Sequence, residues 1–95
     1  MDHRTITIAR SEALFVSTLQ RSDSPGAGQV GQSIARTIRQ YGSRGCAARV
    51  AQEFGDHPEI AVIRMRWARQ VVDEVFGAIH PNTPPFAPSQ LTRAA

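Results

Sequence analysis

Apolar side chains recur at steps of three and four residues along residues 11–77, which is the spacing of one face of an α-helix. Ser11 is a suitable N-cap for a first helix that ends near Gln20, because a segment rich in turn-forming residues follows it. A second helix is predicted between Ser24, its N-cap, and Gly42, which suits the left-handed position just past a helix end. The pattern therefore predicts an all-α domain.

Two further helices are predicted on either side of Gly55. Ser43 can cap a short third helix, which Gly55 closes. Asp56 and Glu59 have the spacing of a capping box at the start of a fourth helix, which runs to about Phe76. Apolar residues cover more of this helix than the stripe of about 100° that a surface helix needs. We therefore expect the fourth helix to lie at the centre of the bundle or to be shared with a second subunit.

The two ends of the chain have a different pattern. Polar and β-branched apolar residues alternate between Arg4 and Ala9, which predicts a short strand or an extended arm over residues 1–10. A frayed terminus is the alternative. Residues 78–95 contain four prolines and are predicted to form an irregular, flexible tail. The expected architecture is a small bundle of about four helices, over residues 11–77, with an N-terminal arm and a Pro-rich C-terminal tail.

Length and composition restrict the class of protein. The chain has 95 residues, of which 41% are hydrophobic, and this is enough for one small domain and too little for two. No apolar run approaches the roughly 18 residues of a membrane span, and the first residues lack the pattern of a signal peptide. Cys46 is the only cysteine, which excludes an intrachain disulfide. We therefore expect a cytoplasmic protein without a membrane partner.

The positive charge is concentrated in one region of the chain. All eleven basic residues are arginines, the formal net charge is +3, and no acidic residue occurs between Asp23 and Glu53. Guanidinium groups bind phosphates well, so the region favours nucleic-acid binding. Ion pairing with acidic side chains and a merely solvated face remain as alternatives, and codon usage in a GC-rich genome also accounts for arginine in place of lysine. The predicted nucleic-acid-binding residues are Arg36, Arg39, Arg44, Arg49, Arg66 and Arg69.

The segment around Gly55 resembles a helix-turn-helix. Ala51 is small enough for close contact between two helices, and Gly55 would form the turn. The resemblance implies that the third and fourth helices approach DNA. Asp56 departs from the motif, because an apolar residue usually follows the turn glycine, and Ile60 and Val62 stand where base-reading side chains are expected. Such helix pairs also occur in bundles that bind no nucleic acid.

Arg64 lies in the middle of the apolar side of the fourth helix. A charge at this position must be paired, lie at an interface or reach solvent past Trp67, because a lone buried guanidinium costs several kcal/mol. For Trp67 itself, core packing is favoured over stacking on a base or anchoring a partner. The predicted partner or dimer interface comprises Ile60, Ile63, Arg64, Trp67 and Val71.

No sequence motif points to catalysis. The chain lacks a phosphate loop, a nucleophile elbow, a dinucleotide fingerprint and the spacing of a zinc site, so neither an enzyme nor a metal or cofactor is expected. We interpret Cys46 as a buried thiol. The predicted function is that of a small DNA-binding or DNA-associated regulatory protein. The alternative is a helical protein-interaction module, an adaptor or a regulatory subunit. A core of about 65 residues and the broad apolar face of the fourth helix favour a homodimer.

Overall fold

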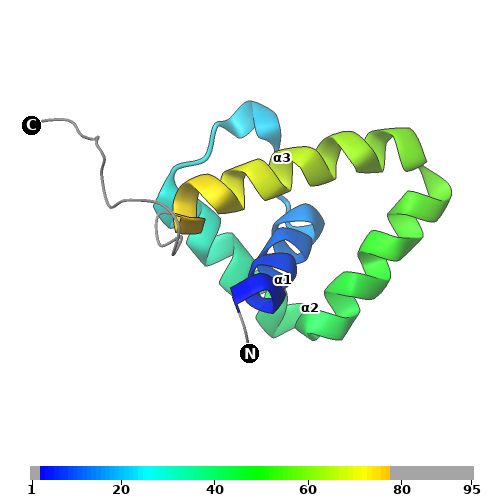
Figure 1. Cartoon of the computed structure of the whole chain (residues 1–95), viewed down its shortest axis with the longest axis horizontal. Helices are drawn as coiled ribbons and strands as arrows, with labels where there is room; N and C mark the ends of the chain where they lie inside the picture. Colours follow the sequence, from blue (N-terminus) through cyan, green and yellow to red (C-terminus); the bar gives the residue numbers. More distant parts are fainter. Residues whose placement is uncertain (1–2, 78–95) are drawn as a thin grey trace, which may run out of the picture.

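The computed structural model describes residues 3–77, and the regular secondary structure in this range is entirely helical (Figure 1). The all-α prediction is confirmed, whereas the described range contains three α-helices in place of the predicted four. The tail predicted over residues 78–95 lies outside the described residues. The elements are α1 at His3–Val16, the 3₁₀ helix η1 at Arg21–Asp23, α2 at Ala27–Asp56 and α3 at Pro58–Phe76.

The predicted second and third helices are one element, α2, which is kinked at Gly42. Gly42 has the predicted positive φ, +72°, combined with a ψ of 167°, a region of backbone conformation essentially restricted to glycine. The predicted break at Gly42 is thus confirmed as a kink between two helical stretches, the second of which begins at Ser43. The two halves of α2 therefore run in different directions, and the second half leads to α3 (Figure 1).

The strand or extended arm predicted for the N-terminus is wrong, because α1 begins at His3 and includes the whole Thr-Ile alternation. Two hydroxyl groups are accommodated within this helix by bonding to the preceding turn. Thr7 Oγ1 donates to the carbonyl oxygen of His3, and Ser11 Oγ donates to that of Thr7, both at 2.9 Å. Ser11 is thus a buried interior residue and not an N-cap. Ile6 and Ile34 of α2 line the same cleft, so this part of α1 lies beside α2.

Helix α2 also begins later than predicted. Ser24 has a φ of +46° and terminates η1, and the N-cap of α2 is Gly26. The N–H of Gly26 donates to Oε1 of Gln29 at 3.3 Å. The turn-rich composition of this segment correctly predicted a break between helices, but the helix starts after the serine and the proline.

A single residue, His57, joins α2 to α3. Its N–H donates to the carbonyl oxygen of Glu53 at 2.7 Å, which completes the last turn of α2. Asp56 is the final residue of α2, and no side chain caps α3, so the predicted capping box with Glu59 does not form. Gly55 lies within α2 and has no positive φ, so it does not make the predicted turn.

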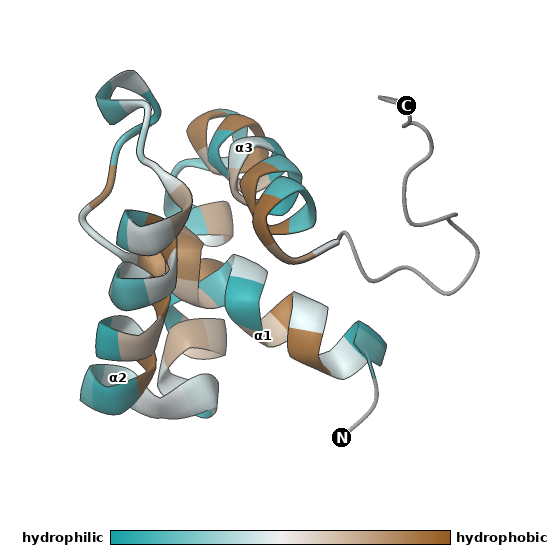
Figure 2. Ribbon diagram, turned by 90° about the vertical axis from the view of Figure 1, so that its left-hand side faces the viewer, coloured by the Kyte–Doolittle hydropathy of each residue, from teal (hydrophilic) through white to brown (hydrophobic). Residues whose placement is uncertain are grey.

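Helix α1 lies in the opening between α2 and α3 and supplies the centre of the hydrophobic core (Figure 1). Leu14 is fully buried, and the ring of Phe15 stacks on that of Phe54 with centroids 6.0 Å apart. The hydrophobic side of α2 faces α1 (Figure 2). Together these helices exclude water from the apolar residues that stabilise the fold. The buried core comprises Ala13, Leu14, Phe15, Val30, Ile34, Cys46, Val50, Ala61, Met65, Ala68 and Val72.

Candidate nucleic-acid and protein interfaces

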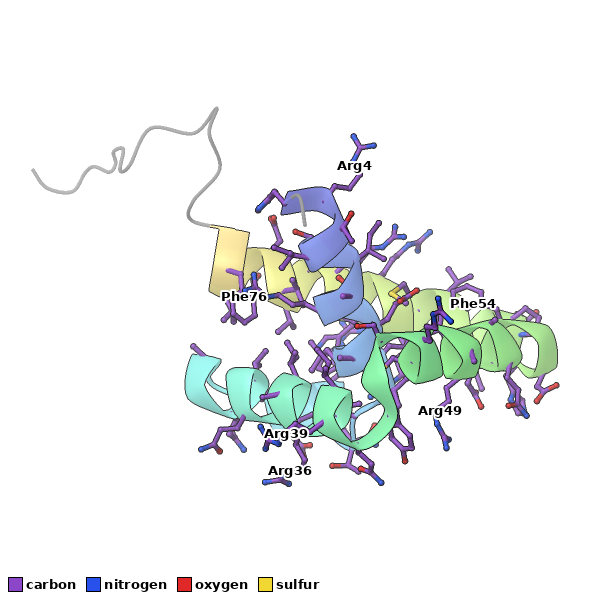
Figure 3. All side chains as sticks on the ribbon, turned by 90° about the horizontal axis from the view of Figure 1, so that it is seen from below. Arg4, Arg36, Arg39, Arg49, Phe54 and Phe76 are labelled. Carbon is purple, nitrogen blue, oxygen red and sulfur yellow. The ribbon has the colours of Figure 1, made fainter. Side chains whose placement is uncertain are left out.

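The predicted arginines of α2 are exposed on the outside of the molecule. Arg36, Arg39, Arg44 and Arg49 are all exposed, and Figure 3 shows Arg36, Arg39 and Arg49 projecting to the same side, away from α1. None of the four makes an ion pair within residues 3–77. Helix α2 contains no carboxylate before Glu53. Acidic side chains therefore do not neutralise these four arginines in the part of the chain that the structure describes. We call Arg36, Arg39 and Arg49 the α2 arginine face. Arg44 is exposed as well, but it lies about 140° of helical rotation from Arg49 and so points to another side of the second half of α2.

Arg49 is held in place by an aromatic ring. Its guanidinium carbon lies 4.0 Å from the centroid of the Tyr41 ring, on the other side of the Gly42 kink. A cation–π contact at an exposed site contributes about 0.5–1 kcal/mol and orients the planar guanidinium. The in-plane N–H groups stay available for an external acceptor, because stacking uses only one face of the group. The kink and the stack together set the direction of this side chain.

The remaining two predicted arginines, Arg66 and Arg69, lie on α3 and do not extend the α2 arginine face. Both are exposed, and each lines a different cleft. Arg66 borders a cleft with Arg21, whereas Arg69 borders one that it shares with Glu12 of α1. Neither cleft includes a residue of α2. The structure thus separates the six predicted residues into the three arginines of the α2 arginine face and three individual side chains, Arg44, Arg66 and Arg69.

The corner between α2 and α3 is acidic and apolar. Glu53, Asp56 and Glu59 are exposed there, and Ile60 exposes 66% of its surface. The Nδ1 atom of His57 lies 3.5 Å from Oε1 of Glu53. Carboxylates at this position repel a phosphate backbone, so the corner lacks a surface suited to a DNA groove.

Arg64 caps the C-terminal end of α1 through backbone oxygens. Its Nε donates to the carbonyl oxygen of Phe15 at 2.7 Å. Its Nη2 lies 3.4 Å, 3.0 Å and 2.9 Å from the carbonyl oxygens of Leu14, Ser17 and Leu19, respectively. Carbonyl groups at the end of a helix lack intrahelical partners and carry the negative end of the helix dipole. The half-buried cation is thus stabilised by main-chain oxygens.

Two aromatic rings enclose the same guanidinium. Its central carbon lies 5.8 Å from the ring centroid of Phe15 and 5.1 Å from that of Trp67. Burial lowers the pKa of Arg64, because desolvation disfavours its charged form. Sequence reasoning identified the unusual position of this charge but missed its role, because carbonyl oxygens give no side-chain signal. Arg64 therefore joins α3 to the end of α1.

The predicted interface on α3 divides into exposed and packed residues. Ile60 and Ile63 expose 66% and 57% of their surfaces, and their spacing places them on one side of the helix. Trp67 and Val71 are partly buried and pack against the core, which agrees with the core assignment for the tryptophan. Val62 is 41% exposed but points to a different side of α3.

The single cysteine lies in the core. Cys46 is buried, and both burial and the charge of Glu12 raise the pKa of its thiol, while Arg49 acts in the opposite direction. A thiol held in its protonated form is a poor nucleophile. Burial also raises the pKa of Glu12. Among the described residues, no three His, Cys, Asp or Glu side chains are grouped as a metal site requires.

No protein family matches the chain, and comparisons with curated proteins and with solved structures give no match either. Within residues 3–77, no helix combines the length and the apolar character needed to cross a lipid bilayer. The functional argument therefore depends on the two surfaces just described, the α2 arginine face and the exposed side of α3.

Proposed function

We propose that the α2 arginine face binds the phosphate backbone of DNA and that the protein is a small DNA-associated regulator. The observation that carries the proposal is the set of exposed arginines without ion pairs, on a helix that has no carboxylate before Glu53. Like charges grouped in this way repel one another, and a bound polyanion relieves the repulsion. Arginine also forms short, bidentate hydrogen bonds with phosphate oxygens.

The spacing of the face suits a duplex. Arg36 and Arg49 are separated by at most about 20 Å along α2, at 1.5 Å per residue. Double-stranded DNA carries one negative charge per roughly 1.7 Å of its axis, so all three arginines of the face have phosphates within reach. Phosphate contacts fix orientation without reading bases, and the acidic corner offers no alternative route into a groove. The proposed binding is therefore independent of DNA sequence.

The test is a salt series of binding measurements on a mixed-sequence duplex, with the fluorescence anisotropy of labelled DNA as the readout. The logarithm of the binding constant should fall linearly with the logarithm of salt concentration, with a slope near −0.9 for each phosphate contacted. Three contacts would give a slope of about −2.7. Absence of binding at low salt, or binding that does not respond to salt, would contradict the proposal.

A second candidate is a helical protein-interaction module, and the exposed side of α3 favours it. Ile60 lies at the edge of a cleft of about 350 Å³ that Phe15, Val16 and Arg64 also line. Exposed apolar residues beside a cleft are typical of protein contacts. Purification from the native host after nuclease treatment and a high-salt wash separates the two functions, because only a protein partner remains bound in stoichiometric amount.

A further inference from the structure

We propose that the exposed side of α3 binds a second copy of this chain, with the two α3 helices antiparallel and related by a two-fold axis near Ile63. The side in question, which we call the α3 outer face, is centred on Ile63 and carries apolar and charged residues in a specific order. This inference concerns a different surface from the α2 arginine face and does not depend on DNA binding. The residues of the α3 outer face are Glu59, Ile60, Ile63, Arg66, Trp67 and Gln70.

The order of charges along this face is self-complementary. Glu59 lies one turn before Ile63, and Arg66 lies about one turn after it. Neither residue makes an ion pair within the described part of its own chain. An antiparallel copy centred on Ile63 brings Glu59 of each chain close to Arg66 of the other, and the two-fold symmetry forms this pair twice. A parallel copy would instead place like charges together.

The apolar residues match in the same arrangement. A cleft of about 240 Å³ between η1 and α3 is lined by Arg21, Ile63, Arg66, Trp67 and Gln70. Ile60 precedes Ile63 by three residues, so the antiparallel copy directs its Ile60 to the region of Arg66 and Trp67. Each chain thus presents an exposed apolar side chain and a cleft that receives it. A surface that contacts its own copy in this reciprocal manner is the normal form of a two-fold dimer interface.

The amount of apolar surface left on α3 also favours a second copy. Ile63 is 57% exposed at the centre of the face, and Ile60 is 66% exposed beside it. A domain of this size has a small core, and association of two such domains buries apolar area that a single chain leaves in water. In a homodimer the second copy of the chain covers the α3 outer face, and no other protein is needed.

Sedimentation equilibrium of the nuclease-treated protein at micromolar concentration tests the proposal. The expected mass is twice the 10.4 kDa of the chain. Ile63→Glu should yield a monomer, because it places two like charges at the two-fold axis. Ile8→Glu is the matched control, since Ile8 is an isoleucine of similar exposure, 50%, on α1, and this variant should remain dimeric. Circular dichroism verifies that both variants keep their helices. A monomeric parent protein, or an Ile63→Glu variant that still dimerises, would overturn the proposal.

A charge exchange tests the orientation. Glu59→Arg alone and Arg66→Glu alone should each raise the dissociation constant of the dimer about tenfold, because each creates two like-charge contacts. The variant that carries both substitutions restores opposite charges across the axis and should return the dissociation constant to near its original value. If the double variant dimerises no better than the single ones, the antiparallel arrangement about Ile63 is wrong.

Discussion

The Nε atom of Arg64 lies 2.7 Å from the carbonyl oxygen of Phe15 and so joins the middle of α3 to the end of α1. The two residues are 49 positions apart in the sequence, so the hydrogen bond is a long-range contact between α3 and α1. The same guanidinium also contacts the carbonyl oxygens of Ser17 and Leu19, where the chain leaves α1. One side chain therefore satisfies several of the acceptors that a helix end leaves unpaired.

We expect Arg64→Met to lower the free energy of unfolding by about 2–4 kcal/mol, because partly buried carbonyl groups then lose their donors. Arg64→Lys should cost less, about 1–2 kcal/mol, since an ammonium keeps the charge but cannot reach the same set of oxygens. Urea denaturation followed by circular dichroism measures both changes. Arg36→Gln is the control at an exposed position and should change stability by less than about 0.5 kcal/mol. Equal stability of the parent and Arg64→Met would contradict the capping role.

The sequence carried enough information for the fold class and for parts of the core. Helical spacing correctly indicated that Val30 and Ile34 face inward, and the place of Gly42 at the end of an apolar stripe correctly indicated its positive φ, although not its ψ of 167°. The start of α1 was missed, because the alternation around Ile6 fits a strand as well as a helix locally. The burial of Leu14 and Phe15, farther along the same helix, in the core that α1 shares with α2 and α3 favours the helix, and that packing is tertiary.

The candidate site was predictable only in part. Arginine spacing placed Arg36 and Arg39 on one side of a helix, and both are exposed. The separation of Arg66 from the α2 arginine face depends on how α3 packs against the other helices. Residue spacing within one helix carries no information about that packing. On α3 itself, periodicity grouped Ile63 with Trp67, but only the packed structure distinguishes the exposed isoleucine from the tryptophan against the core.

The kink in α2 depends on the backbone of a single glycine, and Gly42→Ala tests it. A Cβ atom at this position meets no atom within 4 Å, so any cost comes from the positive φ and not from a clash. We expect a loss of about 1–3 kcal/mol in the free energy of unfolding. Gly31→Ala is the matched control in the same helix, also with open space, and should stabilise the protein by about 0.5–1 kcal/mol. Thermal denaturation of the two variants should therefore shift in opposite directions.

The carboxyl group of Glu12 makes stability depend on pH in an unusual direction. Burial raises the pKa of Glu12 in the folded state, so the native protein holds this proton more tightly than the unfolded chain does. The resulting stabilisation is present below the unfolded pKa and is lost as the pH rises through the folded one. We expect Glu12→Gln to be more stable than the parent at about pH 7, and to lose this advantage toward about pH 4. A difference in unfolding free energy that stays constant between these pH values would contradict the assignment.

The α2 arginine face makes a prediction about the salt dependence of DNA binding. The combined substitution Arg36→Gln and Arg39→Gln removes two phosphate contacts, so it should lower affinity uniformly across DNA sequences and reduce the magnitude of the salt slope by about two. Fluorescence anisotropy over a salt series gives both quantities.

The control for this variant carries the same change of charge elsewhere. Arg4→Gln combined with Arg69→Gln also removes two positive charges, but Arg4 lies on the opposite side of the molecule from Arg36 and Arg39 (Figure 3), and Arg69 lies on α3. This variant should keep most of the slope, because long-range attraction is screened beyond about 10 Å at moderate salt. If both variants lose affinity and slope equally, the DNA responds to net charge alone, and the α2 arginine face has no special role. If only the Arg36→Gln, Arg39→Gln variant loses affinity and slope, the α2 arginine face itself contacts the phosphates, as proposed.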